Sequence, residues 1–207
     1  MKRQINSTTI QCQRNDEFNQ QYVRIDTGED FYSKLKLTHT KQSQSDYLEI
    51  NASLYSGVLT KSFINSCLSE MQKDLSAHQI TSLKLIGLTD KNCEAELFRK
   101  SPINPIHDSS FINLKEVVIE NGFPQDVPTE LQPSTTLPSK PFLHADLDFL
   151  KIDGRQTVPE NFLSNADRVG MLICPDNENT HEFLTSPNLD NVFATLQNNL
   201  DTAQAQE

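Results

Sequence analysis

The sequence predicts an α/β protein whose parallel strands follow one another in chain order, separated by helices or long loops. The first observation is a recurring pair of apolar residues two positions apart, inside short runs typical of a strand with one buried face. The second is the length of the segments between the pairs, which leaves room for the crossover of about a dozen residues that parallel neighbours need. The pairs are Leu48/Ile50, Leu83/Leu85, Val117/Ile119, Leu150/Ile152 and Leu172/Cys174.

The spacing of these pairs indicates repetition of one unit. Their first members are separated by 35, 34, 33 and 22 residues. A near-constant spacing of strand and return segment is typical of a repeat architecture. We therefore expect a repeat-like α/β body over residues 45–185. An amino-terminal hairpin or cap is expected over 1–44, where alternating runs at 22–25 and 35–37 flank a turn with Gly28.

The first two return segments predict helices. In residues 59–79, apolar side chains recur at helical spacing, and Thr60 or Ser62 can serve as the N-cap. The apolar stripe consists of Phe63, Ile64, Cys67, Leu68, Met71 and Leu75. The next segment predicts a short helix that begins near Asp90 and ends before Pro102, because the residue ahead of a proline avoids helical angles.

Proline shapes the later connections. Five of the ten prolines fall within residues 124–141, so this segment is predicted to be an exposed, extended excursion. After Pro159 only a turn or two of helix fits, which accounts for the shorter last spacing. Residues 186–207 are expected to form a carboxy-terminal helix followed by a polar tail.

The length and composition are typical of a domain that is stable without disulfides. A chain of 207 residues can bury a self-sufficient core. The four cysteines form no CxxC pair, so reduced, buried thiols and no cofactor are expected. No apolar run is long enough to cross a membrane, and none follows the basic start. We expect a cytoplasmic protein, or one secreted by a route without a signal peptide.

The charge pattern favours a protein partner. The formal net charge is −10, and the 18 lysines and arginines are scattered rather than clustered, so no nucleic-acid footprint is expected. An acidic surface can be solvated only, or it can dock on a basic protein. We expect a monomer that binds neither nucleic acid nor membrane.

Four segments resemble the L-x-x-L-x-L-x-x-N core of leucine-rich repeats, over roughly residues 45–180. Their three apolar positions are Ile80, Leu83 and Leu85; Leu114, Val117 and Ile119; Leu147, Leu150 and Ile152; and Val169, Leu172 and Cys174. Asn177 occupies the asparagine position of the last segment, where the others have Leu88, Gly122 and Arg155. The resemblance implies an irregular leucine-rich-repeat-like solenoid, although an open parallel sheet would give the same alternation. The composition, rich in Asn and Gln and without Trp, is similar to that of secreted effectors of intracellular bacteria.

Two clusters have the residue types of a reaction site. His144, Asp146 and Asp148 stand at spacing two, which on a strand would place them on one face as ligands of a divalent cation or as an acid/base pair. The alternative is a strand with Leu147 and Phe149 directed inward and solvated polar residues.

Cys174, Asp176 and His181 form the second cluster, with the residue types of a thiol nucleophile, its orienting group and its base. The alternative is that Cys174 fills a core position, where a thiol is inert. Loops that cradle phosphate are missing from the sequence. We therefore favour a protein without enzymatic activity and keep a small cysteine- or metal-dependent hydrolase or transferase as the alternative.

The side chains that flank the apolar pairs are the predicted binding residues. They are Glu49, Asn51, Lys84, Glu116, Glu120, Lys151 and Asp153. Repeat proteins bind partners on such a surface. The sequence therefore predicts a protein-interaction module that binds a protein, with a bacterial effector acting on a host protein as one form of that function.

Overall fold

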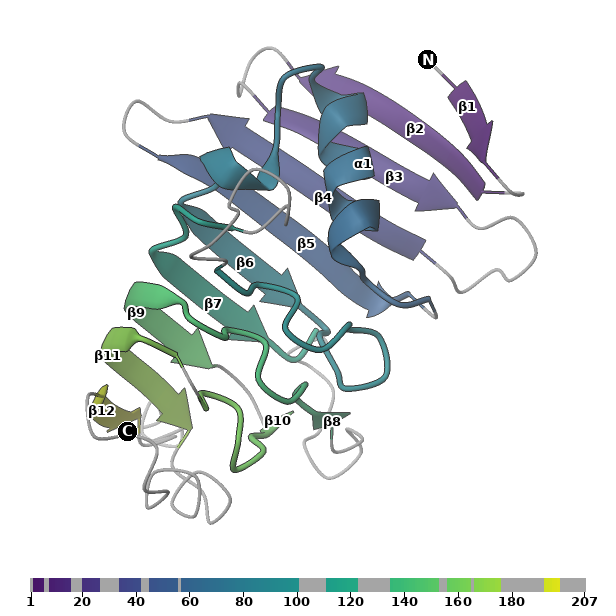
Figure 1. Ribbon diagram of the computed structural model, residues 1–207. Coiled ribbons are helices and arrows are strands. Elements are labelled where there is room, and N and C mark those ends of the chain that lie inside the picture. Colours follow the sequence, from purple (N-terminus) through teal and green to yellow (C-terminus); the bar gives the residue numbers. More distant parts are fainter. Residues whose placement is uncertain are drawn as a thin grey trace, which may run out of the picture.

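The computed structural model describes residues 2–5, 8–15, 20–26, 34–41, 45–55, 57–100, 111–122, 135–152, 156–164, 166–175 and 192–197. A ten-stranded mixed sheet runs through them in the order β1-β2-β3-β4-β5-β6-β7-β9-β11-β12, with β1 and β12 at opposite ends (Figure 1). A separate two-stranded parallel sheet joins β8 and β10.

The elements have the following bounds: β1 Lys2–Ile5, β2 Thr8–Asn15, β3 Gln20–Asp26, β4 Lys34–Lys41, β5 Asp46–Leu54, α1 Lys61–Met71, a 3-10 turn Ala77–Gln79, β6 Ser82–Ile86, β7 Glu116–Glu120, β8 Thr135–Thr136, β9 Asp146–Ile152, β10 Gln156–Thr157, β11 Arg168–Pro175 and β12 Val192–Gln197.

The amino-terminal strands are antiparallel. Each of β1 to β5 pairs with the next strand in the chain. The two runs that predicted a hairpin lie in β3 and β4, where Val23 stands opposite Leu37. The turn that contains Gly28 lies outside the described residues.

The strands from β5 onward are parallel and follow one another in chain order, which confirms the predicted α/β class and parallel arrangement. The predicted apolar pairs stand side by side in the sheet. The first members meet in the order Leu48, Leu83, Val117, Leu150 and Leu172. Each of these side chains is at most 1% exposed, so one row of the core crosses all five strands.

The predicted first helix is confirmed in α1, which lies on one face of the sheet against β2 and β3 (Figure 1). Thr60 is the N-cap, and its hydroxyl accepts a hydrogen bond from the backbone N–H of Phe63 at 3.2 Å. The helix ends at Met71, before the end of the apolar stripe, but Leu75 beyond it is still buried. No helix within the described ranges is long and apolar enough to cross a membrane.

The predicted second helix near Asp90 is wrong, because this segment consists of turns up to Lys100. The side chain of Asn92 is buried and forms hydrogen bonds with the backbone of this loop. Its amide nitrogen donates to the carbonyl of Gly87 at 2.8 Å, and its oxygen accepts from the N–H of Thr89 at 2.8 Å. Local side-chain bonds of this kind compete with helix formation. Residues 101–110 lie outside the described part.

The proline-rich segment is described from residue 135 onward, and over 135–141 the predicted exposure holds for Ser139 but is wrong for three buried residues. Leu137, Pro138 and Pro141 are buried there. The N–H of Leu137 donates to the carbonyl of Thr157 at 3.0 Å, which ties this segment to the next connection. After Pro159 the chain makes turns without a regular helix.

The predicted carboxy-terminal helix is wrong over Val192–Gln197, which form β12 and pair in parallel with β11. Val192, Phe193 and Thr195 are β-branched or aromatic, which suits a strand. As a strand, this segment pairs with backbone groups at the edge of β11, which a helix would leave unpaired. The remainder of 186–207 lies outside the described residues.

Candidate functional site

The predicted binding residues of β5, β6, β7 and β9 lie on the face of the sheet opposite the core. They alternate with fully buried neighbours, as a strand with one covered face requires. We call this surface of the parallel strands the outer face. Its described residues are Tyr47, Glu49, Asn51, Ser82, Lys84, Ile86, Glu116, Val118, Glu120, Phe149, Lys151, Met171 and Ile173. All of them are partly or fully exposed; Asp153, also predicted, lies outside the described residues.

One row of the outer face brings unlike side chains together. Tyr47, Ser82, Glu116, Phe149 and Met171 stand opposite one another on successive strands. Glu116 is exposed, and the hydroxyl of Ser82 donates to its carboxylate at 3.3 Å. Met171 keeps 49% of its surface exposed.

The outward direction of Phe149 corrects the expectation that it points inward with Leu147. Leu147 and Leu150, three residues apart, are both buried, so the alternation shifts between them. The N–H groups of Asp148 and Phe149 both donate to the carbonyl of Lys115, at 2.8 and 3.1 Å. Two residues facing one is the arrangement of a β-bulge, and it turns the ring of Phe149 to the outer face.

Carboxylates set the charge of the middle of this face. The phenol of Tyr47 donates to Glu49 at 3.4 Å, and the ammonium of Lys84 lies 2.9 Å from a carboxylate oxygen of Glu120. Burial, followed by the charge and the hydrogen bond of Glu49 and the charge of Glu120, raises the pKa of Tyr47 to about 12. Glu49, Glu116 and Glu120 thus outnumber Lys84 and Lys151, the two lysines among the described residues of the outer face.

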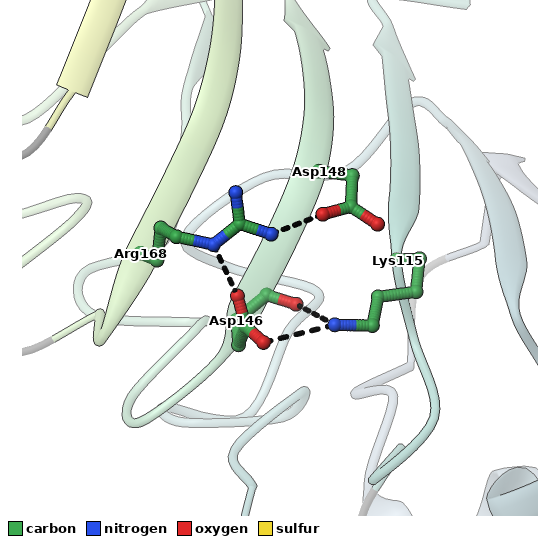
Figure 2. A network of polar contacts seen from close by, with 4 residues as sticks. All are labelled: Lys115, Asp146, Asp148 and Arg168. Atoms are coloured by element: carbon green, nitrogen blue, oxygen red, sulfur yellow. Dashed lines mark hydrogen bonds and ion pairs between the residues drawn. The ribbon is translucent and has the colours of Figure 1, made fainter.

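A network of four charged side chains lies at the amino ends of β7, β9 and β11 (Figure 2). Arg168 donates from Nε to Asp146 at 2.7 Å and from a terminal nitrogen to Asp148. The ammonium of Lys115 donates to the other oxygen of Asp146 at 2.9 Å. These hydrogen bonds, first that of Lys115 and then that of Arg168, lower the pKa of Asp146. The network therefore connects three strands and is balanced in charge.

The predicted metal ligands are not assembled as a site. His144 precedes β9 in a left-handed conformation with φ 57°, and its Nδ1 lies 3.3 Å from a carboxylate oxygen of Asp167. Asp146 and Asp148 both bind Arg168 instead. Across the described residues, no group of three or more His, Cys, Asp or Glu side chains could hold a metal ion.

The predicted thiol nucleophile, Cys174, is 0% exposed in β11, while Asp176 and His181 lie outside the described residues. Cys67 and Cys93 are also buried, as reduced thiols. Burial, assisted by the charge of Glu94, raises the pKa of the Cys93 thiol to about 12.

Sequence reasoning missed Lys115 and Arg168, which neutralise the two aspartates. The available signal was a charged residue just before or at the start of each of three successive strands. Phe149 and Met171 were missed because a bulge, which shifts the alternation by one residue, leaves no mark in an apolar pattern. In comparisons with known proteins, the chain matches no family model, no curated protein and no solved structure.

Proposed function

We propose that this protein is an interaction module that binds a protein partner on the outer face of its parallel strands. The observation that carries the proposal is the contrast between the two faces. One face is a continuous core, and the other presents a registered row in which an exposed carboxylate, an aromatic ring and an exposed thioether are neighbours. Aromatic rings and methionine side chains are enriched at protein interfaces.

The contacts between return segments support a repeat-like organisation, in which each unit touches the units before and after it. The N–H of Phe98 donates to the carbonyl of Pro141 at 2.9 Å, and that of Lys100 donates to the carbonyl of Leu143 at 3.0 Å. The loops after β6 and β7 also meet, since the N–H of Gly87 donates to the carbonyl of Glu120 at 2.9 Å. These contacts favour a degenerate leucine-rich-repeat solenoid over a simple open sheet, and an effector role against a host protein belongs to the same proposal.

The proposal is tested by capture that depends on the outer face. A photo-crosslinking residue is placed at Met171 and, as a control, at Asp74, which is exposed in the turn after α1. Both proteins are exposed to lysate of candidate host cells. We expect one protein to crosslink from position 171 and not from position 74.

Two charge reversals of equal size complete this test. Glu116→Lys should abolish the crosslink from position 171, and Asp74→Lys should leave it unchanged, with circular dichroism showing that both variants fold. Crosslinking from position 171 that survives Glu116→Lys together with Ile173→Asp, or that comes equally from both crosslinker positions, contradicts binding on the outer face.

A further inference from the structure

Glu116 and Phe149 are cross-strand neighbours on the outer face. The two residues are direct partners on the neighbouring parallel strands β7 and β9, whose separation is about 4.8 Å. Met171 is the partner of Phe149 on the other side. A carboxylate, a ring and a thioether therefore follow one another across three strands.

Among the described residues, the carboxylate of Glu116 forms no ion pair. Ser82 supplies a hydrogen bond at 3.3 Å, which leaves most of the exposed carboxylate open to a further donor. The nearest cations toward the amino end, Lys115 and Arg168, are held by Asp146 and Asp148. On the other side, Lys84 is held by Glu120, and Lys151, which stands opposite Val118, has an interaction of its own.

We infer, on the basis of the proposed function, that the outer face recognises an arginine of its protein partner. The carboxylate of Glu116 binds the guanidinium group of this arginine, and the plane of the guanidinium lies over the ring of Phe149. The aliphatic stem of the arginine lies against Met171. The partner segment is therefore basic and apolar, which complements the excess of Glu49, Glu116 and Glu120 over Lys84 and Lys151 on this face.

Arginine fits this position better than lysine. A guanidinium is planar, so it can stack on a ring while its N–H groups point at a carboxylate in the same plane. Cations also prefer the face of an aromatic ring, and arginine makes this contact more often than lysine does. An ammonium at the same place would reach either the ring or the carboxylate with good geometry, but would not match both.

The probe is a pool of phage-displayed random dodecapeptides, selected on the wild-type protein after depletion on the Glu116→Gln variant. Peptides recovered from the pool are synthesised, and their binding is measured by fluorescence anisotropy. Enriched peptides should carry arginine next to an apolar residue. Their affinity should fall about tenfold or more for Glu116→Gln, as expected when a charge-assisted hydrogen bond is lost. Replacing arginine by lysine in the peptide, or Phe149 by Leu in the protein, should also weaken binding.

The matched control is Glu160→Gln, which removes the same charge from an exposed position after Pro159 and should leave affinity unchanged. Recovery of no arginine-containing peptide overturns the inference. So does recovery of peptides that bind wild type and Glu116→Gln equally well. If the crosslink from position 171 is lost in Ile173→Asp while Glu116→Gln has no effect, the arginine site fails and the proposed function stands. If no binding responds to any variant of the outer face, both fail.

Discussion

The ring of Phe98 stacks on the ring of Phe142 with centroids 5.5 Å apart, although Phe98 follows β6 and Phe142 follows β7. Phe142 in turn meets the edge of Phe162, which follows β9, at 5.6 Å. All three rings are at most 1% exposed. One aromatic side chain from each of three successive return segments therefore joins a buried column that runs across the strands.

Removing the middle ring should destabilise the fold strongly. Phe142→Ala empties a buried site between two rings and should lower the free energy of unfolding by about 3–5 kcal/mol. Phe149→Ala is the matched control, because the same atoms are removed from the outer face, and its cost should be clearly smaller. Urea unfolding followed by circular dichroism measures both. Equal losses of unfolding free energy in the two variants would show that the buried aromatic column stabilises the fold no more than Phe149 does on the outer face.

The parallel strands could be predicted from the sequence because burial of one face requires apolar residues at spacing two. Leu83 and Val117 were placed in neighbouring strands, and the structure sets them opposite each other. The face on which Glu116 and Glu120 lie followed from the same alternation. The register between neighbouring strands could be predicted for the same reason, since a slip of one residue would expose the apolar residues.

The connections could not be predicted equally well, because their conformation is decided by contacts with distant segments. Residues near Asp90 have a helical pattern, but Asn92 bonds the backbone of its own loop and Leu59 pairs with Cys93 as an isolated bridge. The segment that begins at Val192 has a helical stripe, but the edge of β11 offers a backbone ladder. In both cases tertiary context overrides local propensity.

Gly87 occupies a position at which only glycine fits. Its φ is +72°, and a Cβ there would lie 2.5 Å from the Cα of Ser53. Gly87→Ala should therefore lower the free energy of unfolding by at least about 1–2 kcal/mol, the cost of the left-handed conformation alone. Gly87→Asn separates the two causes, because asparagine tolerates this φ but still carries the Cβ. Thermal unfolding should show no rescue by asparagine, whereas a wild-type melting temperature in Gly87→Asn would exclude the backbone clash.

The charged network should make stability depend on pH in the acidic range. Lys115 and Arg168 lower the pKa of Asp146 in the folded protein below its ordinary value of about 3.9. The folded state favours the ionised form of Asp146. Its contribution to the free energy of unfolding is therefore fully present above the pKa of the unfolded state, and it is lost as the pH falls through the lowered pKa of the folded state. Asp146→Asn should thus be less stable than wild type at pH 7, by roughly 1 kcal/mol for a partly exposed network.

Urea unfolding at pH 7, 4 and 2.5 checks this dependence. The difference between wild type and Asp146→Asn should shrink as the pH is lowered across this series. Glu160→Gln, at an exposed position away from the network, should show no such convergence. A difference that stays constant down to pH 2.5 would mean that ionisation of Asp146 does not contribute.

The buried thiols should resist alkylation in the folded protein, which also tests the cysteine-dependent alternative. Cys93, with a pKa raised to about 12, is ionised at pH 8 in roughly one molecule in ten thousand, and Cys174 is 0% exposed. Iodoacetamide followed by peptide mass spectrometry should modify both only after unfolding, whereas a cysteine introduced by Asp74→Cys should react in the native state. Fast labelling of native Cys174 would contradict its core position and restore it as a candidate nucleophile.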